Sequence, residues 1–344
     1  MKQMELKGLM PRQSIGWFDG KVKYIDQRLL PNELRVVETD DWHVLARAIT
    51  TLAVRGAPLI GVTAAFAVAA AALKYSVNGL KPKLEHVIDS LATTRPTAVN
   101  LFWALEAMRN TLNNCKNPES IPSALISKAL DIFKDDKSRC DKLGDFGASV
   151  IPQNGTVLTI CNTGFLAAAG IGTALAAVYR AFDLGKKPHV YSCETRPLLQ
   201  GARLTAWELK QADIAFDLLV DSVAANLIRG GKVDLCIIGA DRIASNGDTV
   251  NKIGSFQLAL ACGNFGVPFF VSAPLSTVDY SCKSGADIPI EERSMEEVIK
   301  IGGKRITPKG VSALNPAFDM VPVDMITGII TEKGIFSPPI IFPR

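Results

Sequence analysis

The chain has 344 residues, which is long enough for two domains with substantial hydrophobic cores. Hydrophobic residues make up 48% of it and charged residues 21%, a composition that excludes a disordered chain. The net charge of +4 is too small to indicate nucleic acid as a partner, and no basic run with interleaved aromatic residues occurs in the sequence.

The cysteines and histidines form neither a disulfide framework nor a metal-ligand pattern. The seven cysteines make an odd count without a C-x-x-C pair, and several lie in apolar, strand-like runs. We interpret them as reduced thiols of a cytoplasmic protein. The three histidines, His43, His86 and His189, stand far apart in the sequence, which disfavours a histidine-based metal site.

Two apolar stretches are as long as a membrane span but differ from one in composition. Residues 57–73 are mostly Ala, Gly and Thr and contain Pro58, whereas residues 157–179 are interrupted by Asn162 and by glycines. We interpret the first as a buried helix and the second as a strand, a turn and a helix. The N-terminal sequence MKQMELKGLM lacks the apolar segment of a signal peptide, so no membrane partner is expected.

The first part of the chain is predicted to be mainly helical. Residues 14–25 resemble two short strands joined by Asp19-Gly20, which is a strong hairpin signal. Helices are expected after a capping Asp40 or Asp41, from Pro58 to about Leu73, over 84–93, over 98–112 and within 116–148. We therefore assign residues 1–128 to a mainly helical N-terminal domain that carries a small hairpin.

From Gly155 onward, strand-like apolar runs alternate with helical stretches. Strands are expected over 157–160, 189–193, 215–220, 233–239, 267–272 and 327–331, and helices near 165–181, 198–212, 222–230 and 254–264. This alternation predicts a parallel, doubly wound sheet. The expected fold class is α/β, with residues 129–344 forming a Rossmann-like catalytic domain.

Two residues that leave the ends of predicted parallel strands are the candidates for catalysis. Cys161 follows the first strand and precedes a predicted helix, whose N-terminus favours a thiolate. Asp241 follows the run VDLCII, and burial among apolar neighbours raises the pKa of such an acid, as proton donation near neutral pH requires. Taken singly, Cys161 fits a small buried thiol at a strand end equally well, and for Asp241 a helix cap or turn former is the favoured interpretation. Taken together, they predict one crevice beyond the strand ends, where α/β sheets bind ligands.

Arginines that precede prolines are candidates for binding an anion. Arg55, Arg95 and Arg196 each stand just before a proline that opens a predicted helix. A helix N-terminus presents free N–H groups to a phosphate, and an adjacent guanidinium adds a bidentate contact. For each arginine alone a surface position is the simpler interpretation, but for the set at least one phosphate contact is expected.

Polar residues of two further stretches complete the candidate site. Gln200 and Arg203 either reach the same pocket or cap backbone groups. Asn251 and Lys252, in a predicted glycine-rich loop over 239–254, suit a sugar hydroxyl and a phosphate, or else are solvated. The G-x-G at 170–172 falls inside a predicted helix, too late for a dinucleotide fingerprint, so no nicotinamide or flavin cofactor is expected.

Motifs along nearly the whole chain resemble those of a known family. They are IDQRLLP (25–31), VRGAPLIGV (54–62), TRPTAVNL (94–101), CNTG (161–164), ETRPLLQGARLTAWEL (194–209), GADRIASNGDTVNKIG (239–254), IPIEERSMEEV (288–298) and NPAFDMVP (315–322). With these motifs the sequence resembles the methylthioribose-1-phosphate isomerases of methionine salvage. That family shares its fold with regulatory subunits of the eukaryotic initiation-factor exchange complex and with ribose-1,5-bisphosphate isomerase.

The resemblance implies an aldose–ketose isomerase that converts 5-methylthioribose 1-phosphate to 5-methylthioribulose 1-phosphate. It implies that Cys161 and Asp241 are the catalytic residues. It implies substrate contacts at Arg55, Gly56, Ala57, Arg95, Gln200, Asn251 and Lys252. It further implies a homodimer that needs no cofactor and no metal.

Three questions stay open at this stage. Hydrogen can move from C2 to C1 as a hydride or through an enediol. The substrate can instead be 5-deoxyribose 1-phosphate or ribose 1,5-bisphosphate. The chain can also be a non-catalytic regulatory subunit that senses a sugar phosphate or a nucleotide, although the joint presence of Cys161, Asp241 and Asn251-Lys252 disfavours this.

Overall fold

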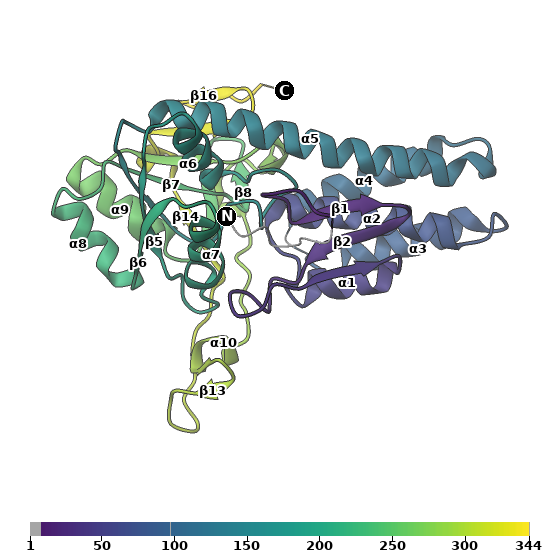
Figure 1. The fold of residues 1–344 in the computed structure, drawn as a ribbon, viewed down its shortest axis with the longest axis horizontal. Helices are drawn as coiled ribbons and strands as arrows, with labels where there is room; N and C mark the ends of the chain where they lie inside the picture. Colours follow the sequence, from purple (N-terminus) through teal and green to yellow (C-terminus); the bar gives the residue numbers. More distant parts are fainter. Residues whose placement is uncertain (1–7, 97, 344) are drawn as a thin grey trace.

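The structure, a computed structural model, describes residues 8–96 and 98–343 (Figure 1). Residues 1–7, Thr97 and Arg344 lie outside this description, and with them most of the N-terminal stretch in which no signal peptide is expected. Figure 1 shows an elongated molecule, with helices in one half and a sheet flanked by helices in the other. The predicted α/β class is confirmed.

A small antiparallel sheet near the start of the chain packs on the helical half. Its strands are β1 (Ile15–Phe18), β2 (Lys21–Ile25) and β3 (Val36–Thr39). β1 and β2 form the predicted hairpin. Asp19 and Gly20 both have positive φ, the conformation that a two-residue turn between twisted strands requires. β3 is an addition to the prediction, because its short sequence shows little alternation.

The helical half is built around one buried helix. Its helices are α1 (Trp42–Thr50), α2 (Ala57–Lys74), α3 (Leu80–Ala92), α4 (Val99–Asn114) and α5 (Ile121–Val150). Asp41 caps α1 by accepting a hydrogen bond from the His43 N–H at 2.9 Å, as predicted. α2 is apolar and long enough to cross a membrane, but its residues from Leu59 to Ala72 are buried inside the protein. It is therefore the core helix that the sequence predicts.

The strands of the C-terminal half form a sheet whose order reverses next to its first strand. They are β4 (Thr156–Thr159), β5 (His189–Cys193), β6 (Ala215–Leu219), β7 (Leu235–Ile238), β10 (Phe269–Ser272), β15 (Gly328–Thr331) and β16 (Gly334–Phe336). The order is β16-β15-β10-β7-β4-β5-β6, and only the β15–β16 pair of this described sheet is antiparallel. The chain winds from β4 to β6 in one direction and from β7 to β15 in the other. The switch point thus lies between β4 and β7, where doubly wound sheets bind ligands.

Helices cover both faces of this sheet. α5, α6 (Ala174–Asp183) and α7 (Ala206–Gln211) pack on one face, and α8 (Ala224–Arg229) and α9 (Ser255–Phe265) pack on the other. Along β7, Leu235 and Ile237 enter the first core, whereas Cys236 and Ile238 enter the second. This alternation follows from the period of two in a strand and explains why buried parallel strands are continuously apolar.

A second, smaller sheet adjoins the switch point. Its strands are β8 (Arg242–Ala244), β9 (Thr249–Lys252), β11 (Val278–Asp279) and β14 (Phe318–Val321), in the order β11-β8-β9-β14. The prediction of a glycine-rich loop over 239–254 is therefore wrong for most of that stretch, which forms the β8–β9 hairpin. The long-range pairing of β9 with β14 buries its polar residues, and local sequence does not reveal such pairing.

A segment between β11 and β14 leaves the body of the molecule. Figure 1 shows α10 (Glu296–Ile299) and β13 (Lys304–Arg305) on a projecting extension, where β12 (Lys300–Ile301) pairs with β13. Arg196 ties the extension to the body, because its Nη2 donates a hydrogen bond to the Val298 carbonyl oxygen at 2.7 Å. Short 3₁₀ turns occur at Pro118–Ser120, Asp221–Val223, Leu275–Thr277, Gly285–Asp287 and Val323–Met325.

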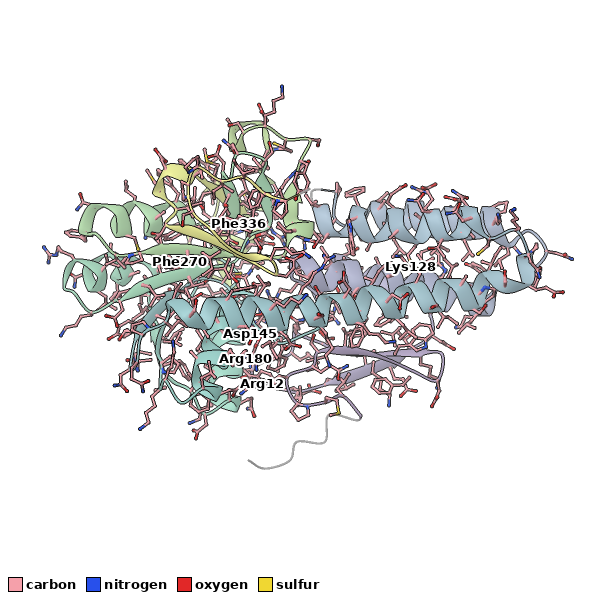
Figure 2. The ribbon with its side chains drawn as sticks, turned by 90° about the horizontal axis from the view of Figure 1, so that it is seen from above. Arg12, Lys128, Asp145, Arg180, Phe270 and Phe336 are labelled. Atoms are coloured by element: carbon pink, nitrogen blue, oxygen red, sulfur yellow. The ribbon has the colours of Figure 1, made fainter. Side chains whose placement is uncertain are left out.

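α5 connects the two halves of the molecule. Figure 2 shows Lys128 of α5 beside the helical half and Asp145 of the same helix beside the sheet. Asp145 Oδ1 lies 2.7 Å from Arg180 Nε of α6, so the end of α5 is fastened to a helix of the sheet half. The domain boundary predicted after residue 128 falls inside this continuous helix.

Asp136 of α5 is expected to make stability depend on pH. Its carboxylate accepts a hydrogen bond from the Ala169 N–H at 2.7 Å, and burial raises its pKa to about 6. Because the folded chain binds this proton more tightly than the unfolded chain does, the free energy of unfolding falls as pH rises from about 4 through about 6. Asp136→Asn should remove this fall. At pH 7.5 the free energy of unfolding of the variant should be about 2 kcal/mol higher than that of the wild type.

Urea unfolding at pH 4.5 and pH 7.5 measures this difference. The matched control is Asp131→Asn, an exposed acid on the same helix, which should leave stability unchanged at both pH values. A gain in Asp136→Asn that is equally large at pH 4.5 would contradict the titration of Asp136 as its cause.

Candidate active site

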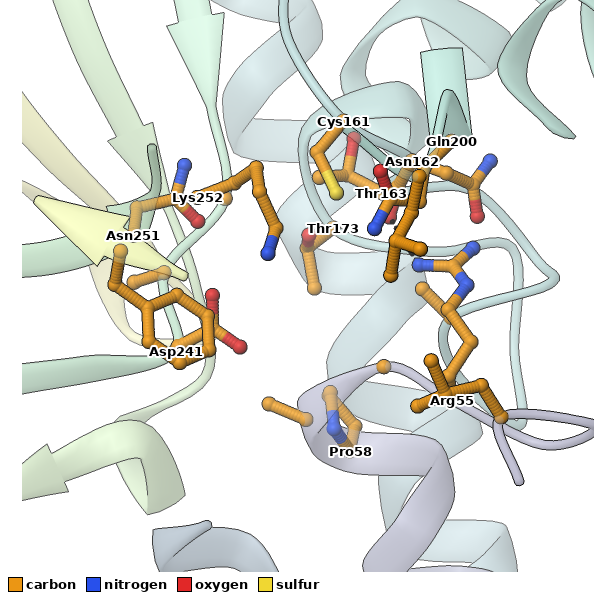
Figure 3. Close-up of a pocket in the computed structure, with 18 of the residues that line it drawn as sticks. Arg55, Pro58, Cys161, Asn162, Thr163, Thr173, Gln200, Asp241, Asn251 and Lys252 are labelled. Carbon is orange, nitrogen blue, oxygen red and sulfur yellow. Dashed lines mark hydrogen bonds between the residues drawn. The ribbon is translucent and has the colours of Figure 1, made fainter. Parts of the chain in front are cut away.

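A cavity of about 90 Å³ opens at the switch point of the main sheet. It lies between the loops that follow β4 and β7 and the N-terminus of α2. Its lining includes every catalytic and substrate-contact residue that the family resemblance implies, namely Arg55, Gly56, Ala57, Arg95, Cys161, Gln200, Asp241, Asn251 and Lys252. Figure 3 shows Cys161 and Asp241 on different sides of this cavity, with Lys252 reaching between them.

Cys161 is held in an unusual backbone conformation at the end of β4. Its φ is 64°, in the left-handed region that few side chains adopt. Its N–H donates a hydrogen bond to Thr195 Oγ1 at 2.8 Å, and its carbonyl oxygen accepts one from Thr205 Oγ1 at 2.7 Å. Both threonines are fully buried, so they fix the direction in which the thiol enters the cavity.

The predicted helix N-terminus beside Cys161 is wrong. α6 begins only at Ala174, and residues 161–173 form an irregular loop. Burial accordingly raises the pKa of the Cys161 thiol, while the positive charges of Arg55 and Lys252 oppose that shift. The net direction is upward, so the thiol form is favoured, and what stabilises a thiolate here is the charge of Arg55 and Lys252 and not a helix dipole.

Asp241 stands in the turn between β7 and β8. Its N–H donates a hydrogen bond to the Val250 carbonyl oxygen at 2.9 Å, which fixes its backbone against β9. Burial raises the pKa of Asp241, whereas the charges of Lys252, Arg95 and Arg55 lower it. The net direction is upward, as expected for an acid that gives a proton to a ligand near neutral pH.

Buried polar atoms at the cavity lack hydrogen-bond partners among the described residues. They are Arg55 Nη2, Asn162 Oδ1 and Gln200 Oε1. Arg55 is otherwise fixed, because its Nε donates to Gln27 Oε1 and its Nη1 to the Asn162 carbonyl oxygen, each at 2.9 Å. An unpaired buried polar group costs about 1–3 kcal/mol, so such groups gathered at one cavity indicate a polar ligand.

The N-terminus of α2 forms another side of the cavity. Gly56 is its N-cap, with a φ of 105°, and Ala57 and Pro58 begin the helix. The first N–H groups of a helix have no partner within the helix and carry a partial positive charge, so they suit an anion. A Cβ on Gly56 would stand 2.5 Å from the Ala167 backbone, and only glycine allows this close approach.

Gly56→Ala is expected to lower the free energy of unfolding by about 3 kcal/mol, because strain at positive φ adds to overlap with Ala167. Gly79→Ala is the matched control, since Gly79 is also an N-cap of positive φ but faces open space. It should cost only about 1 kcal/mol. Urea unfolding of the two variants measures the difference, and equal losses would show that the approach of Ala167 has no energetic weight.

Asn251 and Lys252 are buried residues of β9 and do not belong to a solvated loop. Asn251 Nδ2 donates a hydrogen bond to Ser255 Oγ at 2.8 Å. Lys252 Nζ donates to the Ala317 carbonyl oxygen at 2.9 Å and lies 4.6 Å from the centre of the Phe318 ring. The ammonium group is thus positioned by two neighbours from the β14 side of the cavity.

Of the other predicted cations, one lines the cavity and two contact backbone groups elsewhere. Arg95 lines the cavity, and its Nη2 lies 3.7 Å from Glu291 Oε2. Arg196 instead binds the projecting extension, so the prediction of an anion contact there has no support. Arg203 caps backbone groups, with its Nη2 donating to the Gln27 carbonyl oxygen at 2.9 Å.

Sequence reasoning missed several lining residues. They include Asn162, Thr163, Thr173, Arg293 and Phe318. Asn162 and Thr163 directly follow Cys161 in the CNTG motif, and this position next to a candidate catalytic residue could have identified them. Within residues 8–96 and 98–343, no group of three or more His, Cys, Asp or Glu side chains is arranged to hold a metal ion.

Comparison with known proteins assigns the chain to a family. The sequence model of the Initiation factor 2 subunit family matches residues 53–338. The chain belongs to this family. Methylthioribose-1-phosphate isomerase of Geobacillus thermodenitrificans is 47% identical to it, over 95% of this chain and 92% of the relative. The protein of the same name from Thermoanaerobacter sp. is 48% identical, over 94% of this chain and 95% of the relative.

Solved structures of similar proteins carry two different functional descriptions. 5-Methylthioribose 1-phosphate isomerase from Pyrococcus horikoshii OT3 is 40% identical, with a TM-score of 0.89 over 98% of this chain and 97% of that one. Translation initiation factor eIF-2B, subunit delta, from A. fulgidus is 41% identical, with a TM-score of 0.86 over 95% of this chain and 96% of that one. Membership of the Initiation factor 2 subunit family therefore establishes the fold. The function has to be argued from the residues of the cavity.

Proposed function

We propose that the chain is a methylthioribose-1-phosphate isomerase of methionine salvage, an aldose–ketose isomerase. Curated relatives of that name match nearly the whole chain at 43% to 48% identity. One structural observation supports the proposal most directly: a thiol, Cys161, and an acid of raised pKa, Asp241, line the same cation-rich cavity. A binding protein has no need of such a pair.

The proposed reaction begins at the sugar ring, because the phosphate on C1 blocks spontaneous opening. Asp241 donates a proton to the ring oxygen as the C1–O bond breaks, and that oxygen leaves as the C4 hydroxyl. Hydrogen then moves from C2 to C1, and the C2 hydroxyl loses its proton to become a ketone. The overall change takes up one proton at the ring oxygen and releases one from the C2 oxygen.

Cys161 assists the movement of hydrogen in this proposal. In a hydride route, the C2–H electron pair moves to C1 with the hydrogen, and the thiolate takes the proton of the C2 hydroxyl. In an enediol route, the thiolate takes the C2 proton and returns it to C1. The cations Arg55 and Lys252, which favour the thiolate, support either role.

The groups at the N-terminus of α2 are proposed to hold the substrate phosphate. Gly56 and Ala57 offer backbone N–H groups there, and Arg55 and Arg95 offer guanidinium groups at the same cavity. The unpaired Arg55 Nη2 supports this assignment, because a phosphate oxygen would complete its hydrogen bonds. Gln200, Asn251 and Lys252 are proposed to contact the sugar.

A second candidate function is that of a non-catalytic regulatory subunit, which the similarity to the A. fulgidus protein favours. The two functions differ in turnover. Purified protein should convert 5-methylthioribose 1-phosphate to a product whose NMR spectrum shows a C2 ketone and a phosphorylated C1 methylene. Binding of the sugar phosphate without turnover would favour the regulatory subunit.

Related sugar phosphates provide the matched substrates for this assay. The value of kcat/KM should be highest for 5-methylthioribose 1-phosphate and lower for 5-deoxyribose 1-phosphate and ribose 1,5-bisphosphate. A reversed order would leave the chain an isomerase and change its substrate.

We further propose that the protein is cytoplasmic and forms a homodimer. Within each chain, residues 1–128 and 129–344 are proposed to act as two domains. The separate hydrophobic core of the helical half supports the division, with α5 as the continuous link between the domains. Light scattering after size exclusion tests the oligomeric state, and a monomer at micromolar concentration would contradict the dimer.

A further inference from the structure

A buried carboxylate lies directly behind the cavity. Glu208 of α7 is 0% exposed and accepts hydrogen bonds at both of its oxygens. Asn162 Nδ2 and the Leu166 N–H donate to Oε1 at 2.8 and 3.1 Å. The Phe165 N–H and the Tyr179 hydroxyl donate to Oε2 at 2.9 and 2.6 Å. One side chain thus fixes three donors of the loop 161–173, which carries Cys161.

The same carboxylate is connected to the cavity residues through Asn162. Asn162 Nδ2 also lies 3.2 Å from Thr205 Oγ1, the hydroxyl that donates to the Cys161 carbonyl oxygen. The Asn162 carbonyl oxygen accepts the hydrogen bond from Arg55 Nη1. A shift of Asn162 would therefore move both the backbone that carries the thiol and the guanidinium proposed to bind phosphate.

The surroundings of Glu208 determine which way the Asn162 amide faces. Both neighbours of the amide, Glu208 Oε1 and Thr205 Oγ1, accept from Nδ2. Oδ1 is then the atom left over, and it has no partner among the described residues. The loop is also shaped around the carboxylate, since a Cβ on Gly164 would stand 1.8 Å from Glu208 Oε2.

We propose that Glu208 is a positioning residue, which turns Asn162 Oδ1 toward the ligand as an acceptor for a sugar hydroxyl and holds the Cys161 loop in place. The nature of the ligand rests on the proposed function, because a sugar phosphate supplies the hydroxyl that donates to Oδ1. The positioning itself rests only on the contacts of Glu208. Glu208 acts through Asn162 and does not touch the substrate.

Glu208→Gln tests this role with almost no change in volume. A glutamine has one acceptor oxygen in place of two, so one of the Phe165 and Leu166 N–H groups must face an NH₂ group. When the NH₂ group stands at the Oε1 position, Asn162 Nδ2 loses its acceptor, and the amide can turn so that Oδ1 faces residue 208. We expect kcat/KM for 5-methylthioribose 1-phosphate to fall about 100-fold, the effect of a displacement of roughly 1 Å at reacting groups.

Tyr179→Phe is the matched control. It removes one donor to Glu208 on the side away from Asn162 and leaves the loop contacts in place. Its stability should fall, but its kcat/KM should stay within threefold of the wild type at a temperature where circular dichroism shows all variants folded. Equal losses of kcat/KM in the two variants would reduce Glu208 to a structural residue.

Alkylation of Cys161 gives a readout that needs no turnover. Iodoacetamide labelling, resolved by peptide mass spectrometry, should be at least tenfold faster at Cys161 in Glu208→Gln than in the wild type, because the loop is released. In Tyr179→Phe the rate should stay within threefold of the wild type. An unchanged rate in Glu208→Gln would overturn the positioning role, whereas a wild type without turnover would overturn only the proposed function.

Discussion

Asp241→Asn is expected to lower kcat about 1,000-fold, within the range that general acid catalysis contributes. Asparagine keeps the size of the side chain and an acceptor oxygen, but it has no proton to give to the ring oxygen. KM should change little, because the cations that bind phosphate stay in place. Steady-state kinetics by NMR of the product measures both constants.

The pH dependence adds a second test of Asp241. Burial raises the pKa of this carboxyl, so the wild type should lose activity as pH rises through that pKa and the acid gives up its proton. Asp241→Asn should lack this limb of the profile. Retention of kcat within tenfold of the wild type would contradict the role of Asp241 as the acid.

Asp248→Asn is the matched control for this variant. Asp248 is a buried acid at the turn of the same β8–β9 hairpin, and it accepts hydrogen bonds from the Gly285 and Val323 N–H groups at 2.9 Å each. It does not line the cavity. We expect this variant to lose stability and to keep kcat within threefold, so that a loss specific to Asp241 reports on chemistry.

The sequence predicts the meeting of Cys161 and Asp241 for a topological reason. Alternating strands and helices imply a parallel sheet, and the carboxyl ends of parallel strands share one edge. Each of the two residues follows an apolar strand, so both had to lie at that edge. The strand order places β4 and β7 side by side, and this is why the two residues reach a single cavity.

The loop after Cys161 shows where local sequence is insufficient. Its apolar, Ala-rich composition predicts a helix from about residue 165, yet α6 starts at Ala174. Glu208 takes the N–H groups of Phe165 and Leu166, and Gly172 adopts a φ of 108° that a helix does not allow. A contact between residues far apart in the chain thus overrides helix propensity, and no window of local sequence contains that information.

The polar residues of the β8–β9 hairpin show a second limit. Asn251 and Lys252 resemble a loop because polar residues rarely fill a buried strand. They are buried here because β14 pairs with β9, and the Ala317 carbonyl oxygen and Ser255 hydroxyl satisfy their polar groups. Functional sites depart from the ordinary hydrophobic pattern, so the stretch most informative about chemistry was the least informative about structure.

Cys161→Ser is expected to lower kcat about 1,000-fold with KM nearly unchanged. A serine hydroxyl is far less acidic than a thiol, so Arg55 and Lys252 cannot favour its anion to a useful extent at neutral pH. The backbone should tolerate the change, because Thr195 and Thr205 hold residue 161 through its N–H and carbonyl oxygen and not through its side chain.

Cys282→Ser is the matched control, since Cys282 is partly exposed and its thiol donates to the Ser284 carbonyl oxygen, which a hydroxyl can also reach. It should keep wild-type kinetics.

The residual activity of Cys161→Ser, together with the source of the hydrogen added at C1, distinguishes the hydride route from the enediol route. In deuterated water, a hydride route leaves C1 of the wild-type product free of solvent deuterium, so deuterium at C1 would indicate an enediol route in which the Cys161 thiol exchanges with solvent before it returns the proton. Full turnover by Cys161→Ser would remove the thiol from both routes and leave the proton of the C2 hydroxyl to another base.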